Sequence, residues 1–101
     1  MSALFTPGPW FAKREGSSTV YIEARLRGST LQEVAACGPT ETVEQQEANA
    51  HLIAAAPRMY DALTNLCAVW KSHCNANGWE PSHVLQYDEA LAALIKARGQ
   101  A

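Results

Sequence analysis

The segment Thr19–Arg27 alternates apolar and polar side chains without interruption, and this pattern constrains the fold more than any other feature of the chain. A period of two places alternate side chains on opposite faces of a β-strand. One face would carry Val20, Ile22, Ala24 and Leu26, and the other would carry Tyr21, Glu23, Arg25 and Arg27. Gly16-Ser17-Ser18 before the segment and Gly28-Ser29 after it are typical of turns. The sequence therefore predicts the middle strand of a three-stranded antiparallel sheet that spans about residues 10–36, with one face buried and one exposed.

The spacing of apolar residues changes from two to three or four after Cys37-Gly38-Pro39, which ends the predicted sheet. We expect helices at about 43–55, 57–75 and 84–98, with Gly99 just beyond the last one. Thr42 followed by Gln45 is a capping-box pattern at the start of the first helix. One apolar stripe would run through Leu52, Ala56, Met59, Leu63, Leu66 or Cys67, Trp70 and Cys74, and the last helix would turn Leu91, Leu94 and Ile95 inwards.

Pro57 allows two descriptions of the first two helices. The stripe keeps its phase through the proline, which permits one kinked helix. Proline also suits the first turn of a new helix, and we favour a short helix, a break at Ala56-Pro57 and a longer second helix. Strands followed by helices, with the helices on one sheet face, define an α+β fold. We expect a single domain over residues 1–101 with a short flexible N-terminus (1–6).

Composition narrows the class of protein. The chain has 101 residues, 48% of them apolar and 18% charged, which is typical of a globular domain. A formal net charge of −2 argues against a protein that binds nucleic acid by neutralising phosphates. We expect neither a signal peptide at the N-terminus nor an apolar run of the roughly 20 residues that cross a membrane. Three cysteines without framework spacing predict reduced thiols and a cytoplasmic location.

Residues with catalytic or metal-binding chemistry form no recognised motif. Cys67, His73, Cys74 and His83 could supply zinc ligands, but their spacing matches no standard zinc module. Cys37, together with a histidine distant in sequence, is the only candidate nucleophile, and no local motif marks it as activated. The isolated glycines form no phosphate-binding loop. We therefore predict no enzyme activity, no catalytic or metal-binding residues and no cofactor.

Two exposed features remain as candidates for binding a partner. The polar face of the central strand offers Tyr21, Glu23, Arg25 and Arg27, although we favour a solvated face with ion pairs as the explanation of these residues. Trp79 lies in a polar loop, where an exposed tryptophan can anchor an interface. Asn49 is expected to hydrogen-bond a neighbouring loop or sheet edge, and His51 to point to solvent.

Two phrases carry a resemblance to a known group of proteins. Residues 6–10 read Thr-Pro-Gly-Pro-Trp, and residues 48–57 read Ala-Asn-Ala-His-Leu-Ile-Ala-Ala-Ala-Pro. Together with the amphipathic segment 59–70, they resemble a family of small phage and prophage proteins over roughly the whole chain. The chain departs from that family at His51, where arginine is usual, and at residues 58–60, where acidic and leucine residues are usual. The departures weaken any transfer of a shared binding surface.

The resemblance implies a phage accessory protein that acts inside a bacterial host, and such proteins include inhibitors of host defence. We therefore predict a non-enzymatic protein that inhibits or modulates a host protein complex, in the manner of an anti-CRISPR protein. An alternative is a self-associating structural or regulatory module, a possible homodimer, that pairs through Leu63, Leu66, Cys67, Trp70 and Cys74. A third is an accessory protein that associates weakly with nucleic acid.

Overall fold

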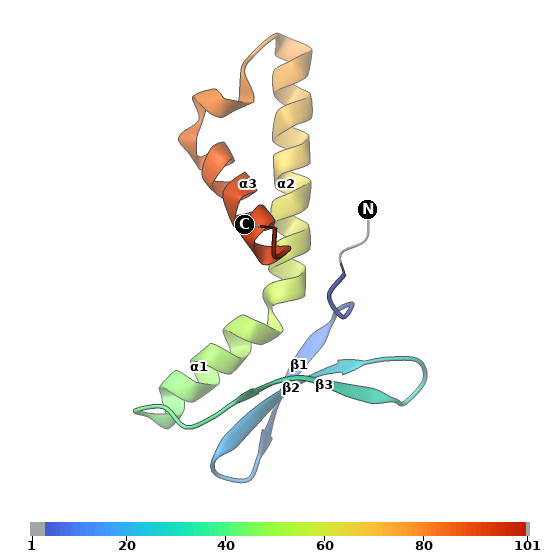
Figure 1. The fold of residues 1–101 in the computed structure, drawn as a ribbon, viewed down its shortest axis with the longest axis vertical. Coiled ribbons are helices and arrows are strands. Elements are labelled where there is room, and N and C mark those ends of the chain that lie inside the picture. Colours follow the sequence, from blue (N-terminus) through green and yellow to red (C-terminus); the bar gives the residue numbers. More distant parts are fainter. Residues whose placement is uncertain (1–3, 101) are drawn as a thin grey trace. The chain divides into compact units, whose positions relative to one another are not determined.

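A computed structural model describes residues 4–100 and confirms an α+β fold (Figure 1). Its elements are β1 (Trp10–Glu15), β2 (Thr19–Arg25), β3 (Leu31–Cys37), α1 (Val43–Ala54), α2 (Ala56–Asn77), a short 3₁₀ helix η1 (Pro81–His83) and α3 (Leu85–Ala97). The chain forms two compact units, residues 1–58 and 59–101, which we call the sheet unit and the hairpin unit. Part of the predicted flexible N-terminus, residues 1–3, lies outside the described residues.

The three strands form an antiparallel meander in the order β1-β2-β3. Trp10 pairs with Ala24 at one end of the β1–β2 ladder, and Glu15 pairs with Thr19 at the other. Val20, Ile22 and Ala24 are buried, so the inner face predicted for β2 is confirmed at these positions. Leu26 is an exception, because the strand ends at Arg25 and Leu26 enters the turn, where its N–H donates to Thr30 O at 2.7 Å.

A bulge in β3 decides which of its side chains reach the core. Ile22 pairs with Ala35 while Glu23 pairs with Glu33, so Val34 is an extra residue on β3. Strict alternation from the buried Cys37 would place Ala35 and then Glu33 on the inner face. The extra residue instead lets Val34 and Ala35 both pack against the core and returns Glu33 to the outer face.

Helix α1 packs against the inner face of the sheet (Figure 1). Ala50 is fully buried and belongs to the same apolar cluster as Val20, Ile22 and Cys37. A small side chain at this position lets the helix backbone approach the strands closely. Burial of one large apolar side chain such as Ile22 stabilises the fold by about 1.5–3 kcal/mol.

Gln46 is a buried polar residue in this core that the sequence patterns do not reveal. Its Nε2 donates to the backbone oxygens of Cys37 at 2.9 Å and Ser18 at 3.0 Å. Its Oε1 accepts a hydrogen bond from Nη2 of Arg14 at 2.9 Å. The amide therefore joins α1 to two strand ends with its polar atoms satisfied, as a buried polar group requires.

The first two helices are separate, as the favoured interpretation of Pro57 predicts. Thr42 caps α1 by accepting from Gln45 N at 3.0 Å, and the Gln45 side chain accepts from Glu41 N at 3.2 Å, one residue before the expected partner. The interruption falls at Ala55, and Pro57 occupies the first turn of α2, where its missing N–H costs no helical hydrogen bond.

The two family phrases meet in the sheet unit. A methyl group built on Gly8 would lie 2.9 Å from Cβ of Pro57, so the Pro57 side chain leaves no room for a larger residue at position 8. Nε1 of Trp10 donates to Thr6 O at 3.0 Å, and the Phe5 ring meets the Trp10 ring edge-on. The phrases therefore form part of the scaffold of this unit.

The hairpin unit contains most of α2, together with η1 and α3, and α3 lies antiparallel beside α2 (Figure 1). Nε1 of Trp70 donates to Pro81 O at 3.1 Å near one end, and Nε of Arg98 donates to Tyr60 Oη at 2.6 Å near the other. Gly99 follows α3 with a φ of 74°, which confirms its predicted role as a helix stop. Cys67, Cys74 and Leu94 are the buried apolar residues among those described in this unit.

The predicted apolar stripe is wrong at several positions. Leu66 is 65% exposed, and Leu52, Met59 and, in α3, Ile95 are also exposed. The prediction is confirmed at Leu63, Cys67, Trp70 and Cys74, which line the buried side of α2. A helix that packs against one other helix can bury only a narrow seam, so apolar residues beside that seam remain in solvent.

Candidate functional site

The outer face of the sheet groups three of the predicted partner-binding residues. Tyr21 stands opposite Lys13 on β1 and Ala36 on β3. Glu23 stands opposite Phe11 and Glu33, and Arg25 stands opposite Leu31. Directly opposed residues share one face of an antiparallel sheet, so all of these side chains lie on the face that α1 leaves bare.

This outer face is more apolar than the sequence patterns indicate. Phe11 is 47% exposed and Leu31 is 49% exposed, while Tyr21 is half-buried among its neighbours. Arg25 is exposed at the end of β2. The exposure of Phe11 is not predicted from the sequence, because β1 is short and its alternation of apolar and polar residues is weak. Pairing of Phe11 with Glu23 places the phenyl ring on the outer face. The face therefore combines large apolar side chains with charges of both signs.

Arg27 lies outside this group, and Trp79 belongs to the other unit. Arg27 lies beyond β2 in the β2–β3 turn, where its backbone oxygen accepts from Thr30 N at 3.2 Å. Trp79 is 53% exposed, which confirms the prediction of an exposed loop tryptophan, and it lies in the hairpin unit. Its ring meets that of His73 edge-on, with centroids 5.5 Å apart.

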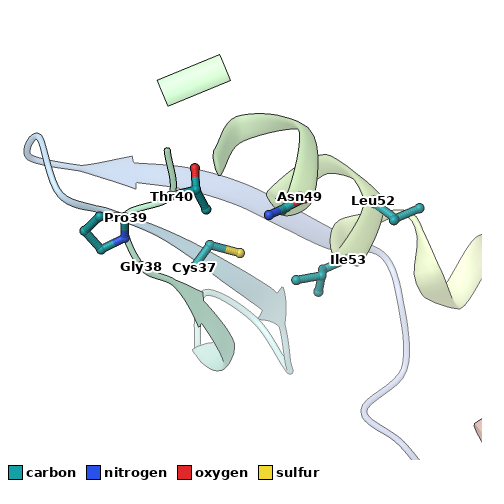
Figure 2. Close-up of a pocket in the computed structure, with 7 residues that line it drawn as sticks. All are labelled: Cys37, Gly38, Pro39, Thr40, Asn49, Leu52 and Ile53. Atoms are coloured by element: carbon teal, nitrogen blue, oxygen red, sulfur yellow. The ribbon is translucent and has the colours of Figure 1, made fainter. Parts of the chain in front are cut away.

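A shallow pocket of about 460 Å³ lies between α1 and the end of β3 (Figure 2). Asn49, Leu52 and Ile53 project from α1, and Cys37, Gly38, Pro39 and Thr40 form the opposite wall. Among residues 4–100 the Asn49 side chain has no hydrogen-bond partner, so its expected bond to a loop is absent. In the sequence, Cys37-Gly38-Pro39 predicts only the end of the sheet, and it is the fold that brings Asn49 beside these residues.

The cysteines have the environment of small apolar residues. Cys37, Cys67 and Cys74 are all buried and free. Burial, with a smaller contribution from the charge of Glu80, raises the pKa of the Cys74 thiol above its usual value, which disfavours the nucleophilic thiolate. Within the described range 4–100, no three His, Cys, Asp or Glu side chains are grouped so that they could hold a metal ion. His51 is exposed, as expected.

These elements define a small α+β protein with one unit built on a three-stranded meander and another on a helical hairpin. The sequence model of the family of Salmonella phage P22 protein Y8K6 matches residues 1–101, and the chain belongs to this phage protein family. No curated protein and no solved structure gave a significant match. No helix within residues 4–100 combines the length and apolar character needed to cross a lipid bilayer.

Proposed function

We propose that this phage protein is a non-enzymatic binding protein that acts in the cytoplasm of the infected bacterium and inhibits or modulates a host protein complex. A host-defence complex is the target class that we favour, in the manner of an anti-CRISPR protein. Membership of a phage protein family supports an action on the host. The net charge of −2 supports a protein partner over nucleic acid.

The observation that carries the proposal is the composition of the outer sheet face. Phe11 and Leu31 are about half exposed beside Tyr21 and Arg25. Aromatic and arginine side chains are enriched in protein interfaces, where they supply a large part of the binding energy. Exposure of the Phe11 and Leu31 side chains is not explained by a face that only contacts water.

Mechanistically, inhibition would follow from occupation of a surface. The outer face is held rigid by two β-ladders and by the core beneath it, so little ordering entropy is lost on binding. A partner seated on this face would lose access to its own substrate or subunit. Such inhibition requires no chemical step from the phage protein.

Capture from a Salmonella lysate tests the proposal. Tagged wild-type protein is expected to retain a specific host protein, and Arg25→Glu, or Tyr21→Ala on the same face, should abolish retention. Arg58→Glu is the matched control, because Arg58 is also exposed but lies on α2. The proposal fails if repeated captures return no specific protein, or if Arg25→Glu and Arg58→Glu bind equally well.

Self-association is a second candidate function, favoured by the exposed apolar row on α2. Met59, Leu66 and Val69 recur at helical spacing, and Leu66 and Val69 are 65% and 66% exposed. Of the residues predicted to pair two copies, Leu66 belongs to this row. The others line the buried side of α2, namely Leu63, Cys67, Trp70 and Cys74. Sedimentation velocity should show a dimer that Leu66→Glu dissociates. A monomer at high concentration rejects this function.

A further inference from the structure

Two glutamates stand directly opposite each other on the outer sheet face. Glu23 on β2 and Glu33 on β3 are register partners, and the β3 bulge is what turns Glu33 outwards beside Glu23. Like charges at directly opposed positions destabilise a sheet. Bulges commonly redirect a side chain next to a functional site. The pair is therefore a local cost to the fold at the face that we propose binds a partner.

Neighbouring cations do not neutralise this pair. Among the described residues of the sheet unit, ion pairs join Lys13 to Glu15 at 4.0 Å and Arg14 to Glu47 at 3.1 Å. Arg25 is two residues from Glu23 on the same face, yet among residues 4–100 it forms no ion pair with either glutamate. Within the described part of the chain, neither carboxylate has a cationic partner within 4.0 Å.

Aromatic and apolar side chains surround the two carboxylates. Phe11 stands on the other side of Glu23, and Tyr21 precedes Glu23 on the same face of β2. Leu31 lies next to Glu33 at the start of β3. A carboxylate pair beside aromatic rings matches a guanidinium group, which hydrogen-bonds carboxylates through its planar fork and stacks on aromatic rings.

We propose that the partner presents an arginine-bearing protein segment to this face, with the guanidinium placed between Glu23 and Glu33 and against the ring of Phe11 or Tyr21. The inference rests on the proposed function and specifies the chemistry of the partner. Charge complementarity favours a cationic group of the partner at this position, because two carboxylates repel phosphate groups and attract a cation. Arginine fits better than lysine, because a guanidinium bonds two carboxylates at once while its flat faces remain free for a ring.

An NMR titration of the full-length ¹⁵N-labelled protein with a blocked Gly-Arg-Gly peptide tests this inference. The amide signals of Phe11, Tyr21, Glu23 and Glu33 should shift, and the double substitution Glu23→Gln/Glu33→Gln should weaken binding by about fivefold or more. Glu89→Gln, on the exposed side of α3, makes the same charge change as Glu33→Gln alone and should leave the affinity unchanged. The amide spectrum of each variant verifies that it is folded, and Glu33→Gln alone provides a milder second variant.

Three outcomes would overturn the inference. They are equal binding by the double variant and the wild type, equal binding of blocked Gly-Lys-Gly, and equal binding of blocked Gly-Glu-Gly. Failure of the proposed function gives a different result: no host protein is captured, while the arginine peptide still binds at Glu23 and Glu33. Conversely, a captured host protein whose retention survives Glu23→Gln/Glu33→Gln would preserve the proposed function and reject this inference.

Discussion

The sheet unit and the hairpin unit differ in how completely they bury their apolar residues. In the sheet unit three strands and α1 enclose Val20, Ile22 and Ala50, and the buried Gln46 has its hydrogen-bond partners. In the hairpin unit α2 leaves Leu66 and Val69 in solvent. Among the described buried side-chain atoms, Oγ1 of Thr64 on α2 lacks a hydrogen-bond partner.

This difference follows from the number of elements that meet in each unit. A sheet covered by a helix buries a whole face, whereas two helices bury only the seam between them. Local stability within one protein follows the density of buried contacts. We therefore expect higher opening free energies for amides of β2 than for amides of α2, as measured by native-state hydrogen exchange.

The largest expected effect is the loss of a core side chain from the sheet unit. Ile22 is fully buried, so Ile22→Ala should lower the opening free energy of the β2 amides by about 2–5 kcal/mol, through lost burial and a cavity. Leu66→Ala is the control in the hairpin unit and should change the α2 amides by less than about 0.5 kcal/mol. Similar losses for both variants would refute the comparison.

A smaller loss of stability is expected from a substitution at the contact between the two family phrases. Gly8→Ala would place a methyl group against Pro57 and should destabilise the sheet unit by about 1–3 kcal/mol through overpacking. Gly38→Ala is the matched control, because no atom lies within 4 Å of its added methyl group and its φ is not positive. Urea unfolding followed by Trp10 fluorescence measures both variants in a Trp70→Phe/Trp79→Phe background. Equal stability of the two glycine variants would show that the contact has no energetic role.

The same substitution should act with opposite sign in the two units. Thr64→Val removes a buried hydroxyl without a partner and should stabilise the hairpin unit by about 1 kcal/mol. Thr42→Val removes the cap of α1 and should destabilise the sheet unit by about 1 kcal/mol. Hydrogen exchange of α2 and α1 amides reports each effect. A destabilised Thr64→Val protein would mean that its hydroxyl is satisfied in solution.

The smallest expected change in stability comes from a substitution on the outer sheet face. Glu33→Gln removes the repulsion with Glu23 and should stabilise the sheet unit by about 0.2–1 kcal/mol, even though we expect it to weaken partner binding. Chemical denaturation at low and high salt provides the measurement, since screening should reduce the gain. A stability loss on neutralisation would remove the argument that the pair is a cost to the fold.

The sequence predicts the sheet unit better than the hairpin unit. The alternation through Val20 and Ile22 predicts the central strand, because both neighbouring strands and α1 reinforce one face. Spacing alone leaves Leu66 and Cys67 as alternatives, since the choice depends on which side of α2 contacts α3, and the structure buries Cys67. The helix break near Pro57 follows from local chemistry and is found one or two residues from its expected place.

The candidate site is only partly predictable for similar reasons. Tyr21, Glu23 and Arg25 follow from the period of β2. The position of Glu33 depends on the β3 bulge, and that of Phe11 on the β1–β2 register, both of which are set by pairing between strands. The pocket beside Cys37 requires α1 to bring Asn49 across from another part of the chain.

Carboxyl labelling with a carbodiimide and glycine ethyl ester, read by mass spectrometry, tests the central claim most directly. The captured host partner is added to the full-length protein, and labelling of each acidic side chain is compared with that in the free protein. We expect Glu23 and Glu33 to be protected in the complex, while Glu89, on the exposed side of α3, is labelled as before. Unchanged labelling of Glu23 and Glu33 in a saturated complex would contradict the assignment of the outer sheet face as the binding surface.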